Sequence, residues 1–431
     1  GTFTYSLVSV QDASPASCSQ PQTGSAIVTV NPLPTATISG STTVCENATS
    51  PFITFTGAVG TAPYTFSYSI NGGPVLTVTT TSGNTVTVPA PTGTPGTFVY
   101  TLLNVTDGTS TACTQNQSGT ATITINPLPT ATISGTTEQC ENGTGPVVTF
   151  TGATGTAPYT FYYRINGGPL LNVTGTGSTV TVTTPTNIPG TYVYTLVSVT
   201  DASSTTCSHL QNGSATIIIH PLPTAAFTNS NPQCPGIAVD FTDQSVPNVG
   251  NLTGWNWNFG DPGSGTANTS ALQNPTHIFY TAGTYTITLT VTNDEGCVSN
   301  VLTRQLIIRA KPEAGFILPD VCLNDTYAQF NDTSLVATPS VISAWQWNFG
   351  DPGSGVNNSS VLQNPQHSYT AVGAYPVELI ATSNHGCKDT VQTQLFVNGS
   401  FPVANFTVSS PATLCANDSV SIVEASTVFP G

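Results

Sequence analysis

Few side chains of this 431-residue chain could carry out chemistry, and they stand apart. Its five histidines lie at unrelated positions, and none has a second histidine or a cysteine at metal-ligand spacing. No G-x-S-x-G, phosphate-loop or HExxH motif occurs. Catalysis by paired carboxylates needs two acids with different roles, whereas Asp261 and Asp351 are copies of one repeated position. We therefore expect no enzyme activity, no catalytic residue and no cofactor-binding residue. The histidines are His209, His220, His277, His367 and His385.

Calcium is the cation for which the sequence offers the most oxygen ligands. Asp240, Asp243, the Asn-Asp-Thr runs 324–326 and 331–333, and two Gly-Asp-Pro turns supply them, and the net charge of -15 would attract cations. No run has the D-x-D-x-D pattern of a calcium loop, and Asp and Asn at turns commonly bond the backbone instead. We expect no metal site, with bound calcium as the alternative.

The ten cysteines are regularly spaced, and they form neither a CxxC pair nor a Cys/His cluster. This pattern favours disulfides in an oxidising, extracellular setting over a metal site. All ten are disulfide candidates: Cys18, Cys45, Cys113, Cys140, Cys207, Cys234, Cys297, Cys322, Cys387 and Cys415.

Charge and composition exclude several classes of protein. Only 6% of the residues are charged, and 5 Lys and Arg face 20 Asp and Glu. A nucleic-acid surface needs a basic stripe that five scattered cations cannot form. No apolar run approaches the length of about 20 residues that a membrane-spanning helix needs, so we expect no membrane insertion. Thr and Val favour strands and Gly, Pro and Asn mark turns, which together predict an all-β fold.

Internal repeats predict the domain organisation. The string NPLPTATISG occurs at 31–40 and again at 126–135, and a Gly-Thr-aromatic strand start recurs with a similar period. Each repeat has about seven predicted strands, which is typical of an immunoglobulin-like Greek-key sandwich. Proline at every junction predicts short, stiff linkers. We expect a window onto a longer array, with complete repeats at 32–126, 127–220, 221–311 and 312–401, the last strands of an earlier repeat at 1–31, and the first strands of a later one at 402–431.

A more specific pattern marks the repeats 221–311 and 312–401. A Trp-x-Trp-x-Phe-Gly-Asp run is followed in each by Asn-Pro-x-His and a Gly-x-Tyr strand. This resembles the polycystic-kidney-disease (PKD) domain. Alternate residues of a strand share a face, so we expect the aromatic residues to point into the sandwich, the glycine to permit a tight turn and the aspartate to accept backbone N–H bonds there. The residues are Trp255, Trp257, Phe259, Gly260 and Asp261, and Trp345, Trp347, Phe349, Gly350 and Asp351.

The repeats 32–126 and 127–220 lack this run and carry Ala-Pro-Tyr-Thr-Phe at the equivalent strand. They look like the Ig-like repeats of giant surface adhesins of Bacteroidota, which mix such repeats with PKD domains and are exported by type IX secretion. The resemblance implies a structural stalk or filament segment of a cell-surface or secreted adhesin, including gliding-motility types, with a glycan or cell-surface ligand bound at a distant tip. The alternative is a set of spacer or carbohydrate-binding modules of a secreted polysaccharide-degrading enzyme.

Two further expectations concern association and cross-linking. Faces rich in uncharged Thr and Asn predict lateral packing into a homo-oligomeric fibre. Within one sandwich, Cys140 and Cys207 should lie at opposite poles, separated by a strand of roughly 20–25 Å. A disulfide tolerates about 7 Å between Cα atoms. We therefore predict pairs between consecutive repeats, with a neighbouring chain as the alternative partner. These pairs are Cys45–Cys207, Cys140–Cys297 and Cys234–Cys387.

Overall fold

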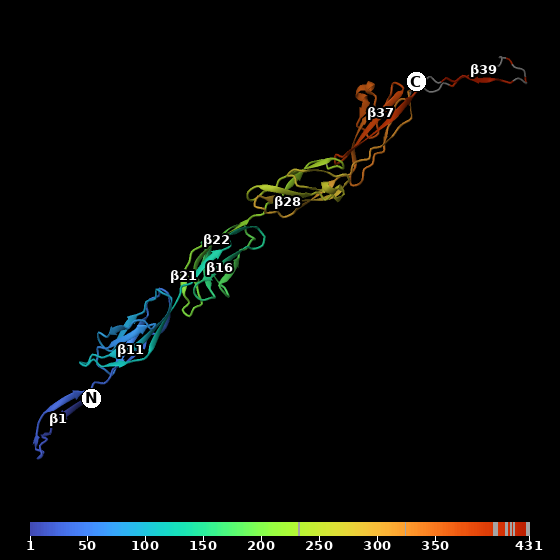
Figure 1. Ribbon diagram of the computed structural model, residues 1–431. Helices are drawn as coiled ribbons and strands as arrows, with labels where there is room; N and C mark the ends of the chain where they lie inside the picture. The colour runs from blue at the N-terminus through green and yellow to red at the C-terminus, as the bar shows by residue number, and fades with distance from the viewer. Residues whose placement is uncertain are drawn as a thin grey trace. The chain divides into compact units, whose positions relative to one another are not determined.

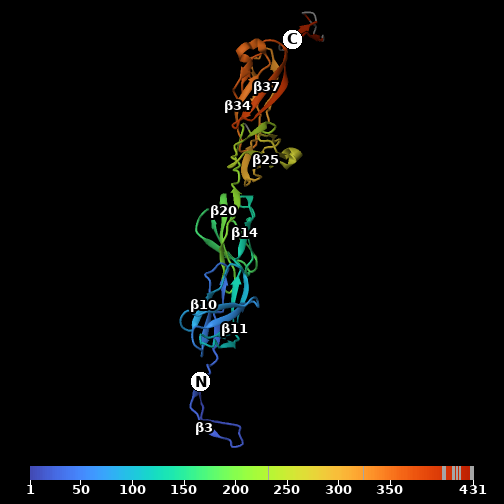
Figure 2. The same cartoon turned by 60° about the vertical axis from the view of Figure 1, so that its left-hand side comes forward.

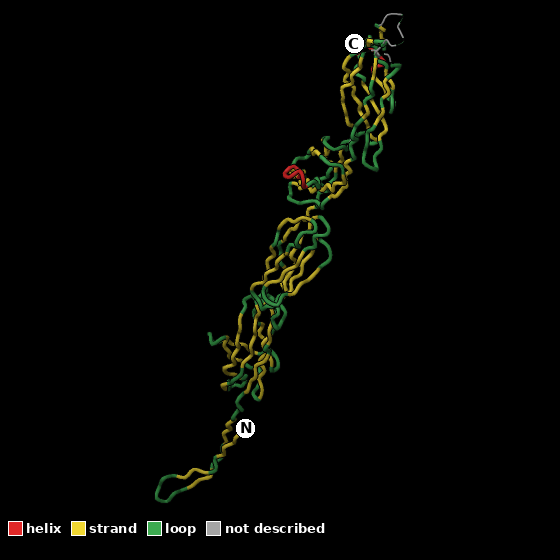
Figure 3. Tube along the Cα trace, turned by 90° about the vertical axis from the view of Figure 1, so that its right-hand side faces the viewer, coloured by secondary structure: helices red, strands yellow, loops and turns green. Residues whose placement is uncertain are grey.

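The computed structural model describes residues 1–431 except 232, 324, 400–403, 410–412, 414, 415, 417, 418 and 428–431. The chain divides into two units, Gly1–Ile219 and His220–Gly431, which are described separately. Strands dominate both, and helical structure is confined to the short 3-10 segments Pro262–Asn268 and Pro352–Asn358 among the described residues (Figures 1 and 3). The predicted all-β fold of tandem sandwiches is confirmed. None of the helices described is long and apolar enough to cross a membrane.

The first complete repeat of Gly1–Ile219 packs a three-stranded sheet on a six-stranded one. The small sheet has the order β10-β7-β5, and the large one β6-β13-β11-β8-β9 with β12 beside β11. Strands β10 and β11, labelled in Figure 2, belong to opposite sheets. The strands are β5 (Thr35–Ser39), β6 (Thr42–Cys45), β7 (Phe52–Ala58), β8 (Thr65–Ile70), β9 (Leu76–Thr79), β10 (Thr85–Pro89), β11 (Gly96–Thr106), β12 (Thr114–Asn116) and β13 (Thr120–Asn126).

Strand β6 is the exception in an otherwise antiparallel repeat. It pairs parallel with β13, and this register places Cys45 opposite Asn126. The next repeat has the same strand order. Its strands are β14 (Thr130–Ser134), β15 (Thr137–Cys140), β16 (Val147–Ala153), β17 (Thr160–Ile165), β18 (Leu171–Thr174), β19 (Thr179–Thr183), β20 (Gly190–Thr200), β21 (Ser208–Leu210) and β22 (Ser214–His220).

Alternating apolar residues from both sheets build each core. In the first repeat the core includes Phe55, Phe66 and Tyr100, and in the second Phe150 and Phe161. The Phe55 and Phe66 ring centroids lie 5.6 Å apart, within the range of favourable aromatic pairs.

The Asn-Gly turns join strands as predicted. Asn166 and Gly167 have φ values of 50° and 70°, the left-handed backbone that a two-residue hairpin turn requires.

Residues 1–31 form antiparallel ribbons outside those cores. β1 (Thr2–Ser6) pairs with β4 (Ser25–Thr29), and β2 (Ser9–Gln11) pairs with β3 (Ser19–Pro21). Apolar side chains on this ribbon are exposed, including Tyr5 at 64% and Ile27 at 67%. The ribbon therefore carries strands like those of a sandwich without a core of its own.

Within His220–Gly431, two further cores each bury a tryptophan, Trp257 in one and Trp347 in the other. The first repeat has the sheets β23-β24-β27 and β26-β25-β28-β29, and the second has β31-β38-β37-β34-β35 with the pairs β30-β33 and β32-β36. The strands are β23 (Phe227–Asn229), β24 (Ala238–Asp243), β25 (Leu252–Asn258), β26 (Thr269–Ser270), β27 (Thr276–Ile278), β28 (Gly283–Asn293), β29 (Leu302–Ile308), β30 (Phe316–Ile317), β31 (Val321–Cys322), β32 (Ala328–Gln329), β33 (Asn331–Asp332), β34 (Ile342–Asn348), β35 (Ser359–Ser360), β36 (Gln366–His367), β37 (Gly373–Ser383) and β38 (Lys388–Asn398).

A last pair of strands, β39 (Phe406–Val408) and β40 (Ile422–Glu424), forms an antiparallel ribbon. The boundaries that the sequence gives for the six segments stay predictions.

Candidate functional site

The tryptophan strands β25 and β34 form the centre of the two repeats of His220–Gly431. Trp257 is fully buried, and its ring centroid lies 5.1 Å from that of Phe227. Its indole Nε1 donates to the carbonyl oxygen of Leu272 at 2.9 Å, and Trp347 donates to Leu362 at 3.0 Å. A buried indole N–H needs such an acceptor. Trp257 and Trp347 therefore pack inside their sandwiches with the indole N–H group of each bonded.

Trp255 lies on the same face at the edge of the core, half-buried. Its Nε1 donates to Asp243 Oδ2 at 2.9 Å, and Trp345 donates to Asp332 Oδ2 at 2.7 Å. Burial acts to raise the pKa of Asp243, but hydrogen bonds from Ser245, Trp255 and Gln273 outweigh it and hold that pKa below its usual value. These two carboxylates, considered above as calcium ligands, thus accept from indole groups.

The turn after the tryptophan strand depends on glycine. Gly260 has a φ of 65°, and a Cβ there would lie 2.5 Å from the carbonyl oxygen of Thr286. The prediction for the next residue was wrong in part, because the Asp261 side chain does not cap the turn. Asn258 and Asn268 do so instead, accepting from the N–H groups of Gly260 at 2.8 Å and Asp261 at 2.6 Å.

The Asp261 side chain bonds a histidine across the sandwich. His277 Nε2 and Asp261 Oδ2 lie 3.1 Å apart. The imidazole is 4% exposed and stacks on Phe259, with ring centroids 4.5 Å apart. The edge of Phe279 closes its other side at 4.5 Å. The histidine is therefore a packed part of the core whose polar edge is satisfied by the aspartate.

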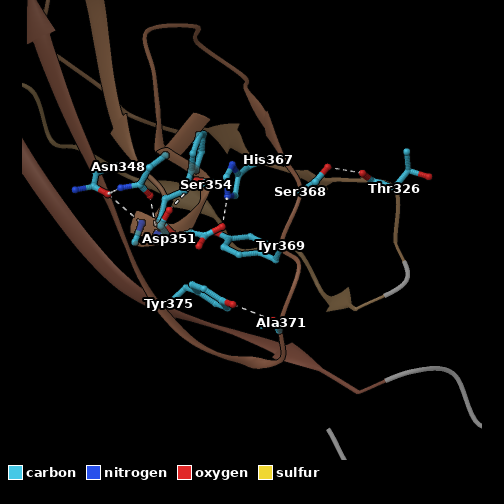
Figure 4. A network of polar contacts seen from close by, with 12 residues as sticks. Thr326, Asn348, Asp351, Ser354, His367, Ser368, Tyr369, Ala371 and Tyr375 are labelled. Carbon is cyan, nitrogen blue, oxygen red and sulfur yellow. Dashed lines mark hydrogen bonds and ion pairs between the residues drawn. The ribbon is translucent and has the colours of Figure 1, made fainter. Parts of the chain in front are cut away.

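The second repeat copies this cluster, which Figure 4 shows from close by. His367 Nε2 lies 3.2 Å from Asp351 Oδ2 and its ring stacks on Phe349 at 4.5 Å. Tyr369 takes the place of Phe279, and its hydroxyl donates to the Phe349 carbonyl at 3.0 Å. Burial raises the pKa of Tyr369. Ser354 Oγ donates to the Asp351 carbonyl at 2.7 Å, so this hydroxyl serves the turn and not the histidine.

A groove opens beside each histidine. In the second repeat it has a volume of about 660 Å³ and is lined by Tyr327, Asn357, Gln366 and His367, among others. The equivalent groove of the first repeat has about 440 Å³ and is lined by Tyr280 and His277, among others. Neutral hydroxyl and amide groups dominate the lining of the groove in the second repeat. Each groove is lined by one exposed tyrosine, Tyr327 in the second repeat at 48% exposure and Tyr280 in the first at 74%. Sequence reasoning missed both grooves.

Comparison with known proteins now adds to this geometry. Residues 220–308 and 309–397 each match the family model of the PKD domain. These two segments are PKD repeats. Solved structures that resemble part of this chain include the PKD1 domain of Epp from Vibrio anguillarum and that of the metalloprotease PrtV from Vibrio cholerae. The former is 30% identical, covering 20% of this chain and 93% of that one with a TM-score of 0.18. The latter is 29% identical, covering 20% and 96% with a TM-score of 0.17.

A longer match is a Ca²⁺-stabilised adhesin with which an Antarctic bacterium binds ice. It is 11% identical and covers 86% of this chain and all of that one, with a TM-score of 0.41.

Two disulfides join consecutive repeats, one in each unit. Cys45 bonds Cys207 with an S–S distance of 2.07 Å and a Cα–Cα distance of 5.6 Å. Cys234 bonds Cys387 with the same Cα–Cα distance and links the two PKD repeats. Both are pairs that the sequence predicts. The third predicted pair, Cys140 with Cys297, combines residues of different units and stays a prediction.

Three cysteines depart from the expectation that all are oxidised. Cys18, Cys113 and Cys322 are free thiols. In both observed disulfides, the cysteine near the start of one repeat bonds the cysteine near the end of the next repeat. The three free cysteines have no such partner among the described residues. Cys415 lies outside the described residues.

The remaining histidines lie at separate places on the surface or at loop contacts. His209 Nδ1 lies 3.2 Å from the Pro129 carbonyl, and His385 Nδ1 lies 3.4 Å from Ser340 Oγ. His220 Nε2 forms an ion pair at 3.6 Å with Glu295 Oε2 when protonated.

Proposed function

We propose that this chain is a structural segment of an extracellular adhesin, in which consecutive β-sandwich repeats hold a binding tip away from the surface that anchors it. The observation that carries the proposal is the disulfide between consecutive repeats, found once in each unit. Enzymes rarely need their modules tied in series, whereas a stalk under tension benefits from a second covalent link at each junction. The chain is proposed to have no catalytic site of its own.

The junction after the first complete repeat supports this role. Cys45 lies opposite Asn126, the last residue of β13, so its disulfide to Cys207 runs alongside the peptide linker. Asn126 Nδ2 donates to Thr205 Oγ1 at 3.0 Å, and Glu46 Oε2 accepts from the Leu128 N–H at 3.4 Å. Two covalent paths and two hydrogen bonds therefore restrain the few residues between the repeats.

Small-angle scattering of residues 32–401 tests the stalk. A rigid array gives the distance distribution of a rod, and the C45S/C234S double variant should broaden it by freeing two junctions. A compact distribution in the unmodified protein would contradict the proposal.

The finer proposal assigns the chain to the giant adhesins of Bacteroidota that type IX secretion exports, including gliding-motility types. Such chains would pack side by side into a homo-oligomeric fibre, and the ligand, a glycan or another cell-surface molecule, would bind at a tip beyond this segment. Mass per unit length of isolated fibres tests the association. A value equal to that of one chain would refute lateral packing.

The grooves of the PKD repeats favour a second candidate, a carbohydrate-binding role of the kind found in modules of polysaccharide-degrading enzymes. Sugars combine an apolar ring face with several hydroxyl groups, and each groove offers an exposed tyrosine, Tyr280 or Tyr327, near neutral polar groups. Screening oligosaccharides against the full chain and its Y327A variant tests this. Glycan binding that Y327A abolishes supports it, and no binding by the unmodified chain counts against it.

A further inference from the structure

A cavity of about 510 Å³ lies beside the disulfide that links the two PKD repeats. The first repeat lines it with the loop 234–237, the linker with Lys311, and the second repeat with Gly386 and Lys388. Binding pockets for small molecules in proteins have volumes of about 300–1,000 Å³. This junction cavity therefore has room for a small organic ligand, and both PKD repeats of the unit contribute to its walls.

The junction cavity gathers positive charge in a chain that has little of it. The sequence has 5 Lys and Arg against 20 Asp and Glu, and its two lysines, Lys311 and Lys388, both line this cavity. Lys311 Nζ forms an ion pair with Asp389 Oδ1 at 2.6 Å. The side chain of Lys388 has no hydrogen bond or ion pair with any residue that the structure describes. One ammonium group is therefore balanced by a carboxylate, and the other is available to an anion.

The disulfide junction of the Ig-like repeats shows that the cross-link itself does not require these lysines. There Asn126 Nδ2 donates to Thr205 Oγ1 at 3.0 Å, and Glu46 Oε2 accepts from the Leu128 N–H at 3.4 Å. The two junctions are aligned by their cysteines and by the linker proline. In this alignment Lys311 corresponds to Asn126, Lys388 to Ser208 and Pro235 to Glu46. At these three positions the PKD junction has two cations and no acid, whereas the Ig-like junction has one acid and no cation.

The remaining wall of the junction cavity offers apolar contact and few free hydrogen-bond donors. Pro235 has no N–H group, and Ile237 is 48% exposed. The backbone N–H groups of Gly236, Ile237 and Gly386 already donate to the carbonyl oxygens of Phe279, Cys234 and Ser383. An extended peptide would find no free backbone donor at these three residues. A sugar ring with an acidic group needs only an apolar surface for its face and a cation for its charge.

We propose that the junction cavity binds the carboxylate or sulfate group of an acidic sugar. Lys388 and Lys311 attract the anion, and Pro235 and Ile237 pack against the sugar ring. An ammonium group is a compact charge that binds such an anion without fixed geometry. The inference rests on these side chains and does not depend on the proposed adhesin role. Its residues are also different from those of the grooves beside His277 and His367.

The small number of amines in the full chain allows a direct test. Reductive dimethylation with isotope-labelled formaldehyde keeps the positive charge of Lys311, Lys388 and the α-amino group of Gly1, and it gives each an NMR signal. The K311Q and K388Q variants assign the two lysine signals. Trigalacturonate is the probe, at low ionic strength because salt screens the attraction between exposed charges. Maltotriose is the uncharged control sugar, sodium sulfate is an anion without a ring, and a hexaglutamate peptide is an acidic chain without a sugar.

We expect trigalacturonate to shift both lysine signals with saturation and to leave the Gly1 signal in place, and maltotriose to shift none. K388Q, followed through the Lys311 signal, should weaken the affinity about threefold to fivefold, the loss of one partly exposed ion pair. R164Q removes the same charge outside the cavity and should leave the affinity unchanged. D389N frees Lys311 from its ion pair and should tighten binding.

Three results would overturn the proposal. The first is the absence of a saturable shift, or an equal shift of the Gly1 signal, which would show that the amines attract anions without a site. The second is an unchanged affinity in K388Q. The third is binding of sulfate or of hexaglutamate that is as tight as binding of trigalacturonate, because the cavity would then not select a sugar.

Discussion

The Ig-like and PKD repeats form the same type of sandwich, but the hydrogen bonds of their polar side chains differ. The Ig-like repeats at 32–126 and 127–220 pair neutral threonines across their strands, such as Thr65 and Thr79 with Oγ1 atoms 2.9 Å apart, and their buried Asp107 and Asp201 accept backbone N–H bonds of nearby loops. The PKD repeats bond side chains of different elements to each other, the buried His277 with Asp261 and the half-buried Trp255 with Asp243. Buried networks carry a larger penalty than surface contacts when one member is lost. The PKD repeats should therefore be more sensitive to loss of these side chains than the Ig-like repeats are to loss of a surface threonine pair.

The largest expected effect is loss of the central tryptophan. Trp257→Ala removes a fully buried ring and leaves the Leu272 carbonyl without its donor, which should cost about 3–5 kcal/mol of unfolding free energy. Urea unfolding followed by tryptophan fluorescence reports on the PKD repeats alone, because all four tryptophans lie there. The unfolding transition of the first PKD repeat should move to a lower urea concentration, while the transition of the second PKD repeat stays unchanged. An unmoved transition would mean that Trp257 does not organise the core.

The buried histidine comes next. His277→Ala opens a space between Phe259 and Phe279 and leaves Asp261 without its partner, which should cost about 2–3 kcal/mol. The matched control is His209→Ala on an exposed edge strand of the Ig-like repeat, with an expected change within about 0.5 kcal/mol. Equal effects at the two positions, measured by urea unfolding, would remove the contrast between the two kinds of repeat.

Acid should weaken the first PKD repeat through Asp243. Its folded pKa lies below the ordinary value of 3.8, so its stabilisation is complete well above that value and is lost as the pH falls through and below it. Asp243→Asn should cost about 1 kcal/mol at pH 7, where a charged acceptor is lost, and less at pH 2. Unfolding free energies measured at both pH values check this.

Trp255→Phe removes one of the hydrogen-bond donors to Asp243. It should lower the unfolding free energy at pH 7 by less than Asp243→Asn does. If the unfolding free energy of the Asp243→Asn variant falls with pH as much as that of the unmodified chain, a group other than Asp243 causes the acid sensitivity.

The smallest effect belongs to the Ig-like surface. Thr65→Ala removes the exposed hydroxyl pair with Thr79, a cross-strand contact that should be worth about 0.2–1 kcal/mol. Differential scanning calorimetry of the Ig-like transition measures it. A loss as large as that of His277→Ala would show that the neutral contacts matter as much as the buried network.

Much of this architecture could be predicted from the sequence because repetition and alternation are local signals. Trp255, Trp257 and Phe259 alternate on one strand, so their shared face follows from strand geometry. The role of Asp261 could not be read locally, since its partner His277 is 16 residues away and a Gly-Asp pair looks like a turn former. Gly-Asp and Asn-Pro-x-His occur together in both PKD repeats, and this joint repetition is the sequence signal that could have predicted the contact between the aspartate and the histidine.

The grooves gave no comparable signal. Tyr280 and Tyr327 stand at non-equivalent positions of the two PKD repeats, so no repeated pattern marks them, and the groove walls come from loops whose placement depends on tertiary packing.

Pulling the full chain from its ends in a single-molecule force experiment tests most directly whether the disulfides between repeats carry load. The two cross-links enclose sequence separations of 162 and 153 residues, which cannot extend while the bonds are intact. At about 3.4 Å per residue, the oxidised chain should reach a full extension roughly 1,000 Å shorter than the C45S/C140S/C234S variant, in which the disulfide of Cys140 is removed as well. Equal extensions in the two proteins would contradict the account, because the load would then pass through the repeats and not around them.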